Sequence, residues 1–354
     1  MKKNFLIKLF LLCTNFTFAQ TQFNYNNYIY SITDSASGIT YGFASGSDRT
    51  NIIDKGLINY RTTGYLPFFN TSGKVKLLKT VRLKDNISEF IGIDTKGVQG
   101  QILISKKDSI LTCNIPDILF GTKVMRKNIV TFDNKNNTFK IVSELPDDIS
   151  SYYKMNLKRN FIEERYYVEL IINDEKVKFL VDTANSNALT CNSNSILNKP
   201  EDTYIYNSLN GFKVETETLQ KYTLNNISHK NFTIKNDVIY FHSGKNILGN
   251  SFFLNYEDVI FDLKNKVIYL KNEFRTVNPF SDEVMFTLNS EGNVEIGFIN
   301  MDSNYYQSGF RVGDIISFED SMFEEEIKRN PCNSRIIVSE YLNNKQQLPN
   351  FIKK

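Results

Sequence analysis

The sequence predicts a mainly β protein with two similar lobes and a small α+β module at its C-terminal end. Apolar and β-branched runs of four to six residues recur along the chain, separated by Asn, Asp and Gly, which is typical of short strands. Long amphipathic stretches are scarce. With 354 residues, 41% of them hydrophobic and 23% charged, the chain is long enough for two domains with packed cores.

An internal repeat supports the two lobes. Residues 129–141 resemble residues 258–270, and each segment has two apolar strands around a polar turn, which predicts a β-hairpin. The offset is 262 − 133 = 129, from Asp133 to Asp262, and we interpret both aspartates as turn residues.

Two further matches occur in the same order. Residues 83–88 resemble 224–228, and Ile52-Ile53-Asp54 resembles Leu180-Val181-Asp182 with an offset of 182 − 54 = 128. The three matches predict duplicated lobes at residues 25–145 and 160–272.

The first twenty residues predict export. Lys2 and Lys3 precede a short apolar stretch, and Thr17-Phe18-Ala19 follows it, which is typical of a secretory signal peptide over residues 1–19. We therefore expect a periplasmic or extracellular protein with no transmembrane segment in the mature chain. Three cysteines remain there and allow at most one disulfide.

Composition argues against several functions. The 42 basic and 39 acidic residues give a net charge of only +3 without a dense basic block, so nucleic acid is not an expected partner. Two histidines and four cysteines without CxxC or CxxH spacing do not predict a metal site, and no cofactor is implied. Catalysis, if present, is expected to use carboxylates.

Asp182 carries the clearest chemical motif. It ends an apolar strand and is followed by Thr183, Ala184 and Ser186, so the carboxylate is expected at the end of the strand, beside a tight turn. Two such loops, one per lobe, would let two carboxylates share one proton and activate water.

This pattern resembles the retropepsin-like and pepsin-like aspartyl proteases, whose motif is apolar, apolar, Asp, Thr or Ser, Gly. The segment 246–253, which contains Gly249, and the segment 259–262 resemble the family's second signature. The resemblance implies that Asp182 is catalytic, that Thr183 braces the loop, and that Ala184, Ser186 and Gly249 shape it. It also implies the bilobal fold and extended peptides as substrates.

The second carboxylate has two candidates. Asp54 fits the repeat, although its motif reads Asp54-Lys55-Gly56, which lacks the hydroxyl and adds an ammonium. Asp34, in Asp34-Ser35-Ala36, is the rival, but only Ile32 supplies an apolar residue before it. For Asp54 the alternative is an ordinary turn residue, which Asp-x-Gly sequences favour, and Asp34 ranks second because it breaks the offset of the repeat.

Residues 280–354 resemble a PDZ-like domain, and the whole chain resembles secreted bacterial two-lobed proteases with such a tail. The resemblance rests on Glu295–Ile299, Ser303–Phe310 and Val312–Ile316. It implies an edge strand that binds an extended peptide. We expect a helix over Glu324–Arg329 and a closing strand over Arg335–Ser339.

The leading functional hypothesis is an aspartic-type peptidase that uses Asp182 and Asp54. The alternative is a catalytically inactive pseudoprotease that binds peptides between its lobes and at the edge of the PDZ-like tail. A third possibility is that two copies of the second lobe associate and supply Asp182 twice.

Overall fold

The computed structural model describes most of the chain after residue 20. The described residues are 21–22, 29–53, 58–69, 75–85, 91–104, 116–192, 200–209, 214–224, 227–230, 232–234, 239–242, 246–275, 283–289, 291–329, 334–345 and 347–354. The predicted signal peptide and Asp54 lie outside them.

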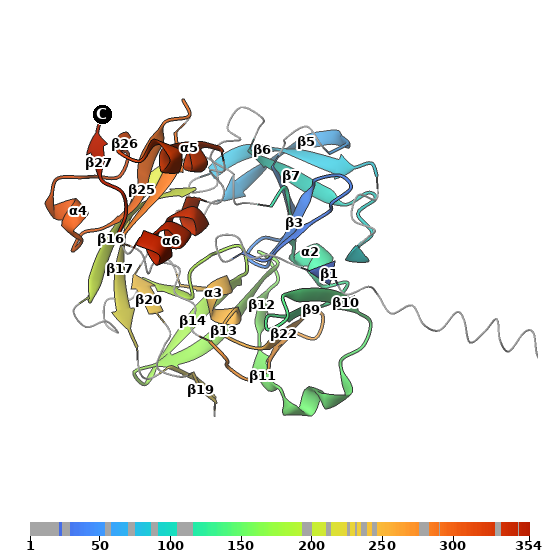
Figure 1. Ribbon diagram of the computed structural model, residues 1–354. Coiled ribbons are helices and arrows are strands. Elements are labelled where there is room, and N and C mark those ends of the chain that lie inside the picture. The colour runs from blue at the N-terminus through green and yellow to red at the C-terminus, as the bar shows by residue number, and fades with distance from the viewer. Residues whose placement is uncertain are drawn as a thin grey trace, which may run out of the picture.

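The fold is mainly β and bilobal, as the sequence predicts (Figure 1). Lobe one contains a seven-stranded sheet in the order β2-β3-β8-β4-β7-β6-β5, and a short helix follows β8. Its elements are β2 Ser31–Thr33, β3 Thr40–Ala44, β4 Thr50–Ile53, β5 Tyr60–Phe69, β6 Val75–Leu83, β7 Gln99–Ile104, β8 Ile118–Gly121 and α2 Thr122–Met125.

Lobe two repeats this arrangement within a larger sheet, which the C-terminal tail extends. The order is β19-β18-β13-β14-β21-β15-β20-β17-β16-β25-β24, in which β24 (Val284–Leu288) and β25 (Val294–Asn300) belong to the tail, and β12 pairs with β13 beside this path. The elements of lobe two are β12 Lys158–Asn160, β13 Arg165–Ile172, β14 Glu175–Asp182, β15 Leu189–Cys191, β16 Asp202–Leu209, β17 Val214–Thr223, β18 Ile227–His229, β19 Phe232–Ile234, β20 Ile239–His242, β21 Ile247–Gly249 and α3 Asn250–Phe253.

A six-stranded sheet joins the lobes in the order β1-β10-β9-β22-β23-β11. Its strands are β1 Thr21–Gln22, β9 Ile129–Asp133, β10 Thr138–Val142, β22 Asp258–Asp262, β23 Val267–Leu270 and β11 Tyr153–Asn156, and the 3₁₀ helix η4 spans Asp147–Ser151. The two repeated hairpins meet at β9 and β22, where Phe132 pairs with Val259 and Val130 with Phe261. With the 129-residue offset, Phe261 is the equivalent of Phe132 and Val259 is the equivalent of Val130. Each pair is therefore converted into the other when the two lobes are exchanged, so the lobes are related by a pseudo-twofold axis.

Both hairpin turns have the same construction, as predicted from the repeat. The Asp133 carboxylate accepts hydrogen bonds from the backbone and side chain of Asn136, and Asp262 accepts the same two bonds from Asn265. Asn137 and Lys266 lie one repeat apart, and both have positive φ, 53° and 61°. The two aspartates therefore stabilise turns, as Asp side chains commonly do.

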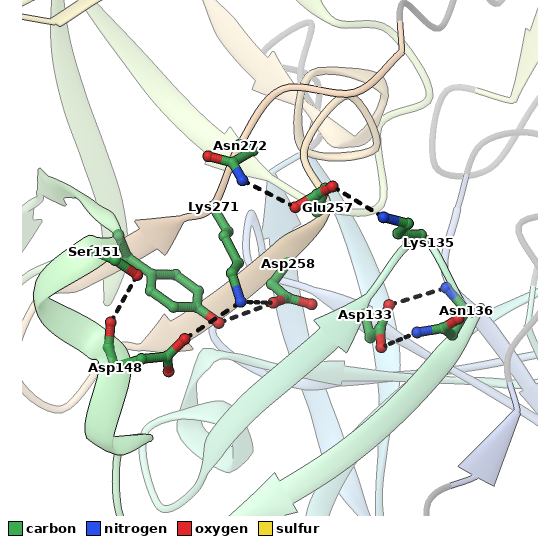
Figure 2. A network of polar contacts seen from close by, with 10 residues as sticks. Asp133, Lys135, Asn136, Asp148, Ser151, Glu257, Asp258, Lys271 and Asn272 are labelled. Atoms are coloured by element: carbon green, nitrogen blue, oxygen red, sulfur yellow. Dashed lines mark hydrogen bonds and ion pairs between the residues drawn. The ribbon is translucent and has the colours of Figure 1, made fainter.

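Polar side chains make contacts across the joining sheet, close to the turn that contains Asp133 (Figure 2). Lys135 of the first hairpin lies 3.3 Å from the Glu257 carboxylate, beside the second. Lys271 contacts Asp258 and Asp148, at 3.4 and 3.3 Å. These pairs are partly exposed and contribute little stability individually.

The stronger connection between the lobes is an aromatic cluster beneath the sheet. The Phe132 ring stacks on Tyr30 with centroids 3.6 Å apart and makes edge contacts with Phe43 and Phe261 at 5.6 and 6.0 Å. All four side chains are fully buried. Residues of both lobes thus belong to one hydrophobic core.

The tail has a separate hydrophobic core. Its elements are β24 Val284–Leu288, β25 Val294–Asn300, α4 Asn304–Gln307, β26 Ile316–Phe318, α5 Ser321–Arg329, α6 Ser334–Lys345 and β27 Phe351–Lys353. The helix expected over Glu324–Arg329 is present as α5.

The closing strand expected over Arg335–Ser339 was wrong, because these residues lie in helix α6. The β-branched run Ile336-Ile337-Val338 favours a strand locally. Ile337 and Val338 are instead buried in the tail core, where α6 packs against β24. Tertiary packing therefore overrides the local preference.

The tail is attached to lobe two through a hairpin. Strands β16 and β17 form this hairpin, and β16 pairs with β25 of the tail from Tyr204 to Tyr206. The Tyr204 ring stacks on Phe298 at 5.1 Å, and Leu219 completes a small buried cluster with them. Within the described residues, no helix is long and apolar enough to cross a bilayer.

Candidate active site

Asp182 stands where the end of β14 meets β21. The two strands are parallel, and Asp182 pairs with Gly249. A Cβ atom on Gly249 would lie 2.1 Å from the carbonyl oxygen of Asn187, so no larger residue fits there without a shift of the loop. Gly249 thus lets β21 pass directly beneath the loop after Asp182.

Lobe one contains the same crossing, formed by β3 and β8. These strands are also parallel, and Ala44 pairs with Gly121. A Cβ atom on Gly121 would lie 2.2 Å from the carbonyl oxygen of Arg49. By strand pairing, the lobe-one equivalent of Asp182 is therefore Ala44, and the equivalent loop reads Ala44-Ser45-Gly46.

The two loops hold each other by reciprocal hydrogen bonds. The Thr183 hydroxyl donates to the Phe43 carbonyl at 2.7 Å, and the Ser45 hydroxyl donates to the Val181 carbonyl at 2.9 Å. The backbone N–H of Ser45 donates to Thr183 Oγ1 at 3.1 Å, and that of Thr183 donates to Ser45 Oγ at 3.0 Å. Both side chains are fully buried, so these bonds are shielded from water.

The Asp182 carboxyl group lies between the loops, and the residue as a whole is half-buried. Its Oδ1 atom accepts hydrogen bonds from the backbone N–H of Ala184 at 3.1 Å and of Gly46 at 3.3 Å. A Cβ atom on residue 46 would lie 2.3 Å from Asp182 Cγ, so the lobe-one loop can approach this closely only with glycine.

The environment of Asp182 favours its neutral form. Desolvation raises the pKa of this carboxyl group above its ordinary value. The bond from Ala184, the charge of Arg165 and the bond from Gly46 oppose this effect but do not cancel it. The carboxyl group can therefore carry a proton at a pH where an exposed aspartate is ionised.

The other predicted motif residues of lobe two surround Asp182. Ala184 donates to it, and the Ser186 carbonyl accepts a hydrogen bond from the Ser251 hydroxyl at the start of α3. The N–H of Asn250 donates to the Asn185 carbonyl at 2.7 Å. The segment after Gly249 thus fixes the loop after Asp182.

Asp54 lies outside the described residues, so its role stays a prediction. The alignment that suggested it needs correction. Ile52 belongs to β4, which is antiparallel to β8, just as β15 is antiparallel to β21 in lobe two. The segment before Asp54 is thus equivalent to β15 and not to β14, the strand that ends at Asp182.

Asp34 is a turn residue. It follows β2 and is half-buried, and its carboxylate accepts hydrogen bonds from the Ser37 hydroxyl at 2.5 Å and the Ala36 N–H at 3.0 Å. These bonds lower its pKa. Its carboxylate therefore serves the β2–β3 turn.

Sequence reasoning missed Ala44, Ser45 and Gly46. The signal was present, since Phe43-Ala44-Ser45-Gly46 matches the family motif at its apolar, hydroxyl and glycine positions. This segment has Ala44 at the aspartate position, and the search for a second motif looked for an aspartate. The described residues contain no cluster of three or more His, Cys, Asp or Glu side chains that could hold a metal ion.

Comparison with known proteins adds little. No family model matches the chain, and no curated protein matches it. Among solved structures, the crystal structure of a retropepsin-like aspartic protease from Rickettsia conorii is similar at 19% identity, with a TM-score of 0.26. The match covers 34% of this chain and 90% of that protein.

Proposed function

We propose that this chain is a peptide-binding protein of the aspartyl-protease type in which the cross-lobe carboxylate pair is absent. The observation that carries the proposal is the pairing of Ala44 with Gly121, at the position where lobe two pairs Asp182 with Gly249. An alanine side chain cannot share a proton with Asp182 or hold a water molecule by a second carboxylate.

The preserved loop geometry supports binding. Thr183 and Ser45 still lock the two loops together, and Asp182, Ala184 and Ser186 remain partly exposed. A partly exposed carboxyl group beside a rigid turn offers a hydrogen-bond donor when protonated and an acceptor when ionised. Either form can bind the backbone of an extended peptide.

An aspartic peptidase is the second candidate. The loop after Asp182 is intact, and desolvation raises the pKa of this carboxyl group, as general acid–base chemistry requires of one member of a pair. Such a peptidase would need a second carboxylate from Asp54 or from another copy of the chain.

One experiment separates the two candidates. The mature chain is incubated with a pool of unstructured peptides from acid to neutral pH, beside Ala44→Asp, Asp182→Asn and Asp54→Asn variants, and both cleavage and binding are measured. The proposal expects binding without cleavage by the wild type and by Asp54→Asn. It expects acid-dependent cleavage to appear with Ala44→Asp and to vanish in the Ala44→Asp/Asp182→Asn double variant.

Cleavage by the wild-type protein that is lost in both Asp182→Asn and Asp54→Asn would overturn the proposal and establish the peptidase. Loss only with Asp182→Asn, together with a dimer in solution, would indicate association of two copies. Absence of both binding and cleavage in folded protein would refute both candidates.

The tail is proposed as a second, PDZ-like peptide-binding site. Strand β24 is the last strand of its sheet among the described residues, and helix α6 packs beside it. An edge strand next to a helix can accept an extended peptide by strand addition. Binding of the peptide pool to a Phe286→Asp variant tests this, since Phe286 is a buried residue of β24 and a charge there should disrupt the strand and abolish any binding to its edge.

Export through the predicted signal peptide is also a proposal. N-terminal sequencing of the protein from a secreting host should find the mature chain beginning close to Gln20, and retention of Met1 would contradict it.

A further inference from the structure

A strongly basic cavity lies apart from the two loops. Its volume is about 560 Å³, within the range of small-molecule sites. None of its lining residues belongs to the loops at 44–46 or 182–186. The lining consists of Lys123, Arg126, Lys127, Arg159, Tyr166, Lys264 and Lys266.

The cavity is formed where three segments of the two lobes meet. Lys123 lies in α2, and Arg126 and Lys127 follow it, so lobe one supplies three cations. Arg159 and Tyr166 come from β12 and β13 of lobe two, and the Tyr166 hydroxyl donates to the Leu263 carbonyl at 2.8 Å. Lys264 and Lys266 belong to the β22–β23 turn, which that hydrogen bond anchors.

The positive charge of the lining exceeds the nearby negative charge. Glu164 pairs with both Arg126, at 2.9 Å, and Arg159, and Asp48 lies 3.6 Å from Lys123. Six cations and two paired carboxylates leave 6 − 2 = +4. In the part of the chain that the structure describes, Lys127, Lys264 and Lys266 make no ion pair.

Two arginine donors also lack partners. The Nε–H groups of Arg126 and Arg159 are buried and donate no hydrogen bond to an acceptor among the described residues. A buried N–H group without an acceptor destabilises the folded state unless a ligand or water supplies one. The lining thus combines excess positive charge with two guanidinium groups, a combination that favours a multiply charged anion.

The rim adds an apolar element. Phe161 and Ile162, in the β12–β13 turn, are 68% and 95% exposed. The Phe161 ring lies 5.0 Å from the Arg159 guanidinium carbon and 5.6 Å from Lys266 Nζ, so it adjoins two cations of the lining. Exposed aromatic and aliphatic side chains beside basic residues are typical of segments that contact anionic lipid surfaces.

We propose that this cavity binds a phosphate group. Phosphate is the ligand because guanidinium groups bind it through paired hydrogen bonds and the lysines add charge. The apolar pair favours a phosphate carried on an anionic lipid, whose acyl region would contact Phe161 and Ile162. The proposal is independent of the peptide-binding function.

The test uses the full mature chain in two arms at constant ionic strength. One arm measures pyrophosphate binding by calorimetry, and the other measures sedimentation with phosphatidylglycerol vesicles against phosphatidylcholine vesicles. The variant is Lys264→Gln/Lys266→Asn, because asparagine tolerates the positive φ at residue 266. The matched control is Lys84→Gln/Lys345→Gln, which removes two exposed lysines outside the lining.

We expect the variant to lose about tenfold or more in affinity, while the control binds like the wild type. Binding to vesicles that also falls in Phe161→Ser/Ile162→Ser identifies a lipid phosphate. Binding of pyrophosphate alone, still dependent on Lys264 and Lys266, identifies a soluble one. Absence of binding in both arms, or equal losses in variant and control, would overturn the proposal.

Discussion

Thr183 and Ser45 exchange hydrogen bonds across the boundary between the lobes, each backbone N–H donating to the other residue's hydroxyl. Each hydroxyl also donates to the carbonyl of the residue two positions before its partner, namely Phe43 or Val181. The arrangement is symmetric even though Ala44 and Asp182, which precede the two residues, are different.

This lock is expected to contribute measurably to stability. Thr183→Val removes a hydroxyl and leaves the buried Ser45 N–H and Phe43 carbonyl without their partner, which should cost about 1–3 kcal/mol of unfolding free energy. Ser45→Ala should cost a similar amount. Chemical denaturation measures both.

The double variant tests whether the two residues act together. Because each hydroxyl serves the other loop, Thr183→Val/Ser45→Ala should cost less than the sum of the single changes, with a coupling of about 0.5–3 kcal/mol. Thr233→Val, on an exposed position of β19, is the control and should change stability little. Strict additivity would show that the lock is not cooperative.

The pKa of Asp182 predicts a pH dependence. Because desolvation raises the folded-state pKa, folding penalises the ionised carboxylate; the penalty is absent below the unfolded-state value near 3.8 and grows as the pH rises above it. Asp182→Asn should therefore become more stable than the wild type as the pH rises from acid to neutral. Thermal unfolding from pH 3 to pH 7 measures this, and a constant difference would contradict the desolvated carboxyl group.

Gly46 is predicted to tolerate no side chain. Gly46→Ala would place a methyl group 2.3 Å from Asp182 Cγ, so the Asp182 carboxyl group or the loop must move. We expect a larger loss of stability than in Gly97→Ala, where nothing lies within 4 Å of the added atom and only the φ of +76° is unfavourable, at about 1–2 kcal/mol. Denaturation of both variants gives the comparison, and equal losses would show that the loop yields easily.

The aromatic cluster should dominate the connection between the lobes. Phe132→Ala removes a fully buried ring that contacts Tyr30, Phe43 and Phe261, and it should cost about 3–5 kcal/mol. Phe161→Ala, on a ring that is 68% exposed, is the matched control and should have little effect on stability. A small effect of Phe132→Ala would mean that the polar contacts of the joining sheet carry the connection.

The repeat could be predicted from the sequence where the two lobes have similar residues that form the same backbone structure. The turns at Asp133 and Asp262 share sequence and hydrogen bonds, so comparing the segments predicted both hairpins. The position of Asp182 at the end of a strand was predictable because the three residues before it are apolar; its role in catalysis stays a prediction.

The partner loop was not found for a physical reason. Its contacts with lobe two use Ser45 and Gly46, which are common residues, and it has Ala44 at the position where lobe two has Asp182. The two lobes also differ in the number of residues between the loop and the glycine that pairs with it. Ala44 and Gly121 are 121 − 44 = 77 positions apart, whereas Asp182 and Gly249 are 249 − 182 = 67 apart, so a constant offset does not align the two loops. The strand pairing identifies the equivalent loops despite this difference in spacing.

The reciprocal pairing of β9 and β22 has a consequence for a separate lobe two. In the whole chain, the edge of β22 is occupied by β9. A separate lobe two would expose that edge, and because β9 and β22 are related by the pseudo-twofold axis, a second β22 could take the place of β9. Two copies of one lobe would then face each other with an aspartate in both loops, whereas fusion into one chain leaves each loop free to change independently.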